Sequence, residues 1–311
     1  MSFRIPLLST LVFAALALMG GVSASVAQQI EASPTTLATT PILRNWMSPE
    51  VADAWKKGYK GKRATITFID DFTSRSKYYG NLGPGTQYLR HGEWTRLEGS
   101  LIAPEATIKS KDFNSGTKVL LATGLNVLNL SYGMYAKSGY SSSQIRWSAQ
   151  EASIISYASG KAVIAKSAGN DGIAVGGVNS AGLTDYLNLS LVGKQSAIIV
   201  GALSSNGTTA KPATLASYSN FAGSDTTVQK QFLVVGVEGN KTGLYGTSFA
   251  APIISGYAAV IGSKFTTATP TQITNQLLNT ARKDTLLNYD ASIYGQGEAS
   301  LSRALAPLSI K

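Results

Sequence analysis

The stretch that decides the fold is Gly246-Thr247-Ser248-Phe249-Ala250-Ala251-Pro252, which is followed by a largely apolar run over 253–261. That run is typical of a buried helix, so Ser248 stands where a glycine-bearing turn becomes a helix. Backbone N–H groups at a helix start lack partners and attract negative charge. Pro252 cannot donate to the carbonyl of Ser248, which again places Ser248 at the helix start. The stretch predicts a serine nucleophile beside an anion-stabilising donor. A turn with a helix cap is the plainer alternative.

Composition limits the classes of protein that fit. The chain has 311 residues, of which 44% are hydrophobic and 14% charged, as expected for one large globular domain or two small ones. It contains no cysteine, which excludes disulfides and thiolate metal sites. His91 is the single histidine, so any imidazole chemistry must use it and a site with several histidine ligands is excluded.

Residues 1–27 have the pattern of a secretory signal peptide. Arg4 supplies a positive start, residues 7–22 an apolar core, and Ser25-Val26-Ala27 a small-residue cleavage site. The apolar run is shorter than a spanning helix needs, so cleavage is favoured over an uncleaved membrane anchor. We therefore expect a secreted or periplasmic protein that has no membrane attachment after cleavage. Residues 28–48 are predicted to form an N-terminal arm, and residues 49–311 the main domain.

The net charge of +10 raises the question of an anionic partner. The basic residues are scattered, however, and the densest group, within 56–63, is typical of a solvated surface. We expect no nucleic-acid partner. A nucleotide-binding α/β domain is also disfavoured, because no Gly-x-Gly-x-x-Gly follows a strand and no P-loop is present.

Apolar runs and turn residues predict alternating strands and helices. Strands are predicted at 63–69, 102–109, 126–133, 162–166, 197–202 and 232–235, and helices at 49–57, from about 94 to 101, at 142–159, after Ser248 and from Pro270. This alternation predicts an α/β domain with a mostly parallel central sheet flanked by helices. Active sites of such sheets lie beyond the carboxyl ends of the strands. Asp70, Ser131, Asn170 and the approach to Ser248 all fall at such ends or in loops.

Two adjacent carboxylates end the first predicted strand. Side chains alternate along a strand, so Ala64, Ile66, Phe68 and Asp70 share one face, while Asp71 points to the other. The first face is the more apolar, so Asp70 is expected to be shielded. Asp71 begins a polar loop and is expected to be solvated or paired with a base.

Several segments together resemble the subtilases, the subtilisin-like serine proteases. Residues 246–252 match the family's nucleophile motif Gly-Thr-Ser-x-Ala-x-Pro, and residues 66–70 resemble the strand that bears its catalytic aspartate. His91-Gly92 is similar to the start of the histidine motif, residues 102–106 to the Ala-Pro-x-Ala element, and residues 163–170 to the segment that ends in the oxyanion asparagine. The resemblance extends over most of residues 45–306 and implies a subtilisin-like three-layer fold.

The resemblance also implies roles for residues. Asp70, His91 and Ser248 would form a catalytic triad, and the side-chain amide of Asn170, with the backbone N–H of Ser248, would hold the oxyanion. Residues implied to flank the substrate are Ser131, Tyr132, Gly133, Ser167, Ala168 and Gly169. The expected activity is hydrolysis of polypeptides by a serine endopeptidase through an acyl-enzyme. A catalytically silent subtilase-like domain that binds peptides or a protein partner is the alternative.

Few cofactor or maturation features are expected. Calcium sites are frequent among subtilases, but no ligands for calcium can be assigned in this sequence, and no other cofactor or metal is expected. Residues 28–62 leave little room for the folding propeptide that many secreted members carry, so none is expected. The oligomeric state cannot be read from the sequence.

Overall fold

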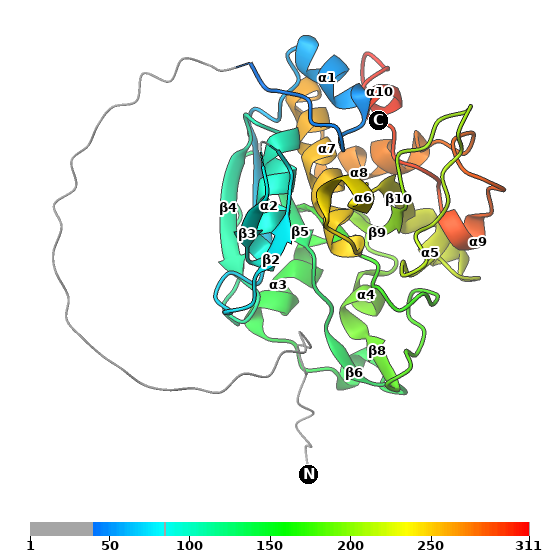
Figure 1. The fold of residues 1–311 in the computed structure, drawn as a ribbon. Helices are drawn as coiled ribbons and strands as arrows, with labels where there is room; N and C mark the ends of the chain where they lie inside the picture. The colour runs from blue at the N-terminus through cyan, green and yellow to red at the C-terminus, as the bar shows by residue number, and fades with distance from the viewer. Residues whose placement is uncertain (1–39, 84, 311) are drawn as a thin grey trace, which may run out of the picture.

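The computed structural model describes residues 40–83 and 85–310, and its centre is a six-stranded sheet. Figure 1 shows how the helices and strands are arranged. The predicted signal peptide and residues 28–39 of the predicted arm lie outside the described residues. The strands are β1 (Ala64–Asp70), β4 (Thr107–Asp112), β5 (Leu125–Leu130), β7 (Val163–Ser167), β9 (Ala197–Leu203) and β10 (Phe232–Gly236). They lie in the order β10-β9-β7-β5-β1-β4, and every neighbouring pair is parallel.

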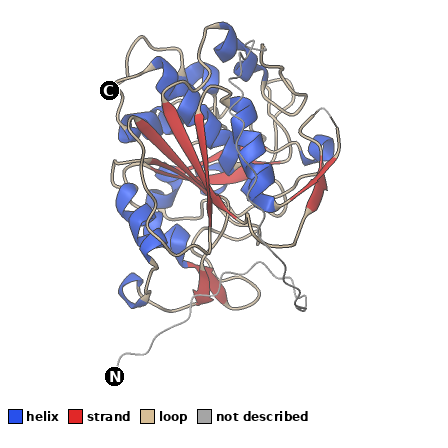
Figure 2. Cartoon of the chain, turned by 90° about the vertical axis from the view of Figure 1, so that its left-hand side faces the viewer, coloured by secondary structure: helices blue, strands red, loops and turns tan. Residues whose placement is uncertain are grey.

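Helices cover both faces of this sheet (Figure 2). On one face, α2 (His91–Ile102), α7 (Ala251–Lys264) and α8 (Pro270–Asn279) bury alternate strand residues such as Ile66 and Phe68. On the other, α3 (Ala149–Tyr157) and α4 (Tyr186–Leu191) pack on residues that include Ile69 and Leu128. Coverage of both faces explains why strands such as β9 and β10 are continuous in apolar character. The predicted three-layer α/β fold is confirmed.

The chain order creates a crevice between two central strands. From β1 the chain passes through α2 to β4 on one side, and then returns to β5 on the other side of β1. Loops leave the carboxyl ends of β1 and β5 in opposite directions at such a switch point, and ligands of open α/β sheets bind there. Asp70 ends β1 and Ser131 directly follows β5, so both stand at this crevice.

The N-terminal and C-terminal helices lie together at one end of the molecule (Figure 1). α1 (Pro49–Lys56) is capped by Ser48, and its Glu50 accepts hydrogen bonds from the Ser300 hydroxyl that caps α10 (Leu301–Ala304). Trp46, inside the predicted arm, is buried in the main core, and its indole N–H donates to the carbonyl of Leu82. The described end of the arm is therefore packed on the domain.

Several predicted elements were wrong in their bounds, among them the strand expected over 126–133, which as β5 ends at Leu130. A strand was expected over 102–109, but α2 continues through Ile102 and β4 begins only at Thr107. Proline cannot continue the helical hydrogen bonding, so Pro104 marks the break. A single helix was expected over 142–159, but a 3-10 turn, η1 (Ser142–Gln144), is separated from α3, whose N-cap is Ser148.

The turn predicted at Ser248 is observed as the 3-10 turn η2 (Thr247–Phe249). Several other short elements were not predicted from the sequence. They are the hairpin β2 (Tyr78–Gly80) and β3 (Gln87–Leu89), the pair β6 (Tyr135–Lys137) and β8 (Leu183–Asp185), and the helices α4, α5 (Thr226–Gln231), α6 (Gly239–Thr242) and α9 (Ala291–Tyr294). Elements of three to six residues are too short to display a hydrophobic period. None of the helices in the described part of the chain has the length and apolar character needed to cross a bilayer.

Candidate active site

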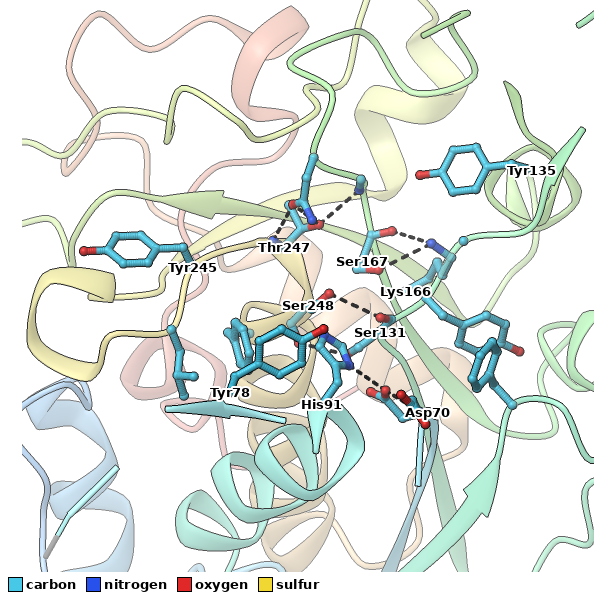
Figure 3. Close-up of a pocket in the computed structure, with 18 of the residues that line it drawn as sticks. Asp70, Tyr78, His91, Ser131, Tyr135, Lys166, Ser167, Tyr245, Thr247 and Ser248 are labelled. Atoms are coloured by element: carbon cyan, nitrogen blue, oxygen red, sulfur yellow. Dashed lines mark hydrogen bonds and ion pairs between the residues drawn. The ribbon is translucent and has the colours of Figure 1, made fainter. Parts of the chain in front are cut away.

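A cavity of about 460 Å³ opens at the carboxyl edge of the sheet, above the switch point (Figure 3). The four residues to which the sequence assigned chemistry, Asp70, His91, Asn170 and Ser248, all line it. Five of the six expected substrate-flanking residues line it too: Ser131, Tyr132, Gly133, Ser167 and Gly169. The structure thus gathers into one cavity residues from β1, α2, the ends of β5 and β7, and η2.

Asp70 and His91 are in direct contact. Nδ1 of His91 lies 2.5 Å from Oδ1 of Asp70, a carboxylate that is only 1% exposed. Because an ionised carboxylate only accepts, Nδ1 carries the proton and Nε2 is the basic nitrogen. The backbone N–H of Asp71 donates to the same Oδ1 at 2.7 Å, and the Thr95 hydroxyl donates to Oδ2 at 2.9 Å. The alternation predicted for β1 is confirmed, since Asp70 follows Ile66 and Phe68 on the face that α2 covers.

Opposing effects act on the imidazole of His91. Burial lowers the pKa of His91, but the charge of Asp70, the hydrogen bond to it and the charge of Asp71 together outweigh burial and raise the pKa above its ordinary value. The ring of Tyr78 packs edge-on against the imidazole with 6.4 Å between the ring centroids, and the centroid of the Phe249 ring lies 5.6 Å from that of the imidazole. The aromatic contacts hold the imidazole at the cavity wall, with a carboxylate behind it.

Ser248 stands in η2, immediately before α7, as its sequence predicts. Gly246 precedes this turn with φ 122°, a conformation that only glycine adopts without strain. The Ser248 hydroxyl donates to the carbonyl of Ser131 at 3.2 Å (Figure 3). The backbone N–H of Ser248 belongs to the first turn of η2, where such groups have no partner within the helix. An anion beside Ser248 would therefore meet a backbone donor.

The amide of Asn170 is oriented by Thr247. Oδ1 of Asn170 accepts from the backbone N–H of Thr247 at 2.8 Å and from its hydroxyl at 3.0 Å. The Thr247 oxygen in turn accepts from the backbone N–H of Gly169 at 3.1 Å. Since its oxygen is engaged in this way, the Asn170 side chain is left to present its NH₂ group as a donor. Thr247 lies within the nucleophile motif, but the motif alone does not indicate that Thr247 orients Asn170.

Asp71 differs from its prediction. It was expected to be solvated or paired with a base, but it is 2% exposed and pairs with no cation in the described part of the chain. Its carboxylate accepts the backbone N–H groups of Thr73 and Ser74 at 3.3 and 2.9 Å and the Ser74 hydroxyl. The loop folds back over the carboxylate as an Asx-type turn, so local backbone donors replace water.

A buried ion pair that sequence reasoning missed lies at the cavity wall, where Lys166 is one of the lining residues. Lys166, which is 1% exposed, places Nζ 3.1 Å from Oδ2 of Asp185 and 2.6 Å from the carbonyl of Ser167. Burial lowers the pKa of Lys166, and the charge and hydrogen bond of Asp185 act against that effect. Tyr135 also lines the cavity, and burial, with the charges of Asp185 and Asp171, raises the pKa of its phenol. The phenol is therefore a neutral donor.

Ala168 is the expected substrate-flanking residue that does not line the cavity. Its side chain is fully buried in a core cluster with Ile199 and Phe232, because alternation turns it away from the face that Ser167 and Gly169 present. Its carbonyl accepts hydrogen bonds from the amides of Asn188 and Asn220, both internal. Ala168 thus supports the cavity wall from behind.

Metal-ligating side chains do not cluster in 40–83 and 85–310. Within these ranges no group of three or more histidine, cysteine, aspartate or glutamate side chains could hold a metal ion.

Comparisons with known proteins agree with this fold. Prenylagaramide maturation protease PagA is 17% identical, with a TM-score of 0.54 over 83% of this chain and 98% of that one. MycP1 from Mycobacterium smegmatis is 19% identical, with a TM-score of 0.54 over 87% and 86%. A lanthipeptide protease is 19% identical, with a TM-score of 0.50 over 84% and 93%. A comparison with curated proteins found no match.

The fold is therefore that of the subtilisin-like proteases. The family itself follows from the sequence profile named Subtilase family, which matches residues 102–297 and so covers more than half of the chain. This protein belongs to the subtilase family. The matched range includes Asn170 and Ser248, whereas Asp70 and His91 precede it and are brought to the same cavity by the fold.

Proposed function

We propose that the protein is a secreted serine endopeptidase that cleaves polypeptides through an acyl-enzyme. The observation that carries the proposal is the 2.5 Å contact between His91 and Asp70 at the wall of a cavity that also contains Ser248 and Asn170. An imidazole held by a buried carboxylate is the general base that a serine nucleophile requires. The membership in the subtilase family supports the same reaction.

The proposed reaction uses the groups of the cavity in sequence. The Ser248 hydroxyl turns from the carbonyl of Ser131 toward His91, whose Nε2 takes its proton as Oγ attacks the peptide carbonyl. The resulting oxyanion is held by the amide of Asn170 and the backbone N–H of Ser248. His91 then protonates the leaving amine, and water releases the acyl group by the reverse path. Asp70 keeps the tautomer correct and stabilises the imidazolium. These steps require no resident cofactor.

Labelling with a fluorophosphonate, followed by peptide mapping, tests the proposal. The label should attach to Ser248, and hydrolysis of an internally quenched peptide should stop when labelling is complete. Ser248→Ala should abolish both, whereas Ser302→Ala, at an exposed serine on α10, should change neither. Correctly folded protein that is neither labelled nor active would favour the silent peptide-binding domain.

Export is proposed from the signal-peptide pattern of residues 1–27. Expression of the full chain in a secreting host should give a product that begins at Gln28, as measured by intact mass. An exported product that retains Arg4 would refute cleavage at this site.

A further inference from the structure

We propose that Thr95 is a positioning residue of the active site, because its hydroxyl fixes the carboxylate of Asp70 in the orientation that holds His91. The inference rests on the proposed function, and nothing in the sequence motifs assigned Thr95 a part in it. Thr95 lies one helical turn after His91 on α2, so both side chains face Asp70. It is 0% exposed, and its hydroxyl is 2.9 Å from Oδ2.

The two oxygens of Asp70 have different partners. Oδ1 accepts from His91 and from the backbone N–H of Asp71, whereas Thr95 is the one protein donor to Oδ2 among the described residues. A carboxylate held through Oδ1 alone can turn about its terminal bond, since such torsions have broad minima. The Thr95 bond adds a second fixed point on the other oxygen. The plane of the carboxylate, and with it the direction of the bond to Nδ1, is then determined.

A purely structural role for Thr95 is the alternative. Helical threonines commonly donate to a carbonyl in the preceding turn, and the Thr95 oxygen is also 3.2 Å from the carbonyl of Gly92. The single hydroxyl proton of Thr95 can be donated to only one of these two acceptors. Oδ2 of Asp70 is both nearer and charged, and charge-assisted bonds are the stronger kind. A buried carboxylate oxygen without a donor would also be costly, so the proton belongs to Asp70.

The test compares Thr95→Val, which keeps the shape and removes the hydroxyl, with Thr95→Ser, which keeps the hydroxyl. The control is Thr274→Val, at a buried threonine on α8 outside the cavity, whose hydroxyl has no hydrogen bond to any described residue. We expect Thr95→Val to lower kcat about tenfold with KM unchanged, as loss of about one charge-assisted hydrogen bond would do. Thr95→Ser should restore kcat, and Thr274→Val should leave kcat at the wild-type value.

A second measurement does not depend on activity. Since His91 is the single histidine, its Cε1–H resonance reports the imidazole titration without ambiguity. The bond to Asp70 raises the His91 pKa, so a change in how the carboxylate is held should shift the His91 pKa in Thr95→Val, and Thr95→Ser should return it to the wild-type value. The acid limb of kcat/KM should move in the same direction.

The results of these measurements distinguish failure of the inference about Thr95 from failure of the proposed function. If Thr95→Val lowers the melting temperature but leaves both kcat and the His91 titration at their wild-type values, Thr95 is structural only and the inference is wrong. If Thr95→Val does not fold, Thr95→Ala carries the same test, with loss of kcat and a shifted His91 pKa expected and unchanged values contradicting the inference. Failure of the wild-type protein to react with a fluorophosphonate would instead count against the proposed function.

Discussion

The hydroxyl of Ser131 donates to the carbonyl of Ser248 at 2.8 Å, and the hydroxyl of Ser248 donates back to the carbonyl of Ser131 at 3.2 Å. The first bond supplies a donor to the carbonyl of Ser248. In a helix the residue four positions further on would donate to this carbonyl, but that residue is Pro252, which has no N–H. Ser131 also accepts from the amide of Asn129, whose oxygen accepts from Ser255 on α7. The end of β5 and the segment around Ser248 are therefore joined by a chain of hydrogen bonds.

Ser131→Ala should weaken this junction. It leaves the carbonyl of Ser248 without its hydroxyl partner, so we expect a loss of about 1–3 kcal/mol in the free energy of unfolding. We also expect a lower kcat, because the nucleophile loses one of its fixed points. Urea unfolding and peptide hydrolysis measure the two effects. Ser302→Ala on the surface of α10 is the matched control, and equal values for both variants would contradict the argument.

The two adjacent carboxylates should differ sharply in their importance. Asp70→Asn removes the acceptor that selects the His91 tautomer, so kcat should fall by about 10⁴. Asp71→Asn keeps an oxygen for the N–H groups of Thr73 and Ser74 and should lower kcat about tenfold at most, through disorder of its loop. Both variants are compared on one peptide substrate. A deeper loss from Asp71→Asn would require the triad to be redrawn.

Asn170→Ala should lower kcat by about 10²–10³, the loss typical of an oxyanion-hole donor. The Asn170 amide is oriented by Thr247 and touches only the charge that develops during the reaction in the proposed mechanism. KM should therefore remain close to the wild-type value. A change confined to KM would show that Asn170 binds the ground state instead.

The features that could be predicted from the sequence are those marked by residues close together in the chain. The sheet and its main helices were predictable because long apolar runs alternate along the chain. The carboxyl ends of those runs also located Asp70, Ser131 and Asn170, since parallel strands bring such ends to one edge. Gly246 and Ser248 were visible in a contiguous motif.

The contacts that complete the site could not be predicted in this way. The Lys166–Asp185 pair joins residues 19 apart, and the Thr95–Asp70 bond joins residues 25 apart. Neither pair follows a local period, because each depends on how separate elements pack. The burial of Asp71 was missed for another reason: its loop folds back over the carboxylate, which a polar composition does not predict.

Lys166→Met should strongly destabilise the fold. The substitution leaves the carboxylate of Asp185 buried without its cation, and loss of one partner of a buried pair costs about 3–5 kcal/mol. The double variant Lys166→Met/Asp185→Asn should recover part of that loss, because an asparagine oxygen can still accept from the N–H groups of Leu187 and Met134. Urea unfolding of both variants measures this. A double variant less stable than the single one would contradict a charge-based explanation.

Glu98 should make stability depend on pH. It is 1% exposed on α2, and its Oε2 has no hydrogen-bond partner among the described residues. Burial raises the pKa of Glu98 well above its ordinary value of 4.5. At a pH below the ordinary value of 4.5, Glu98 is protonated in both the folded and the unfolded state. Above it the unfolded state releases the proton while the folded state keeps it, so stability falls as pH rises, by up to about 1.4 kcal/mol per pH unit, until the folded-state pKa is reached.

Glu98→Gln isolates this effect, because glutamine is neutral at every pH in both states. The free energy of unfolding in urea, measured from pH 4 to pH 9, should fall less steeply for Glu98→Gln than for the wild type above the ordinary glutamate pKa. His91 also has a raised pKa, and its contribution, likewise lost as pH rises, is common to both proteins and cancels in the difference. Glu105→Gln, at a partly exposed glutamate beside Lys60, is the control and should follow the wild-type curve. Parallel curves for Glu98→Gln and the wild type would mean that the Glu98 carboxyl ionises equally in the folded and unfolded states.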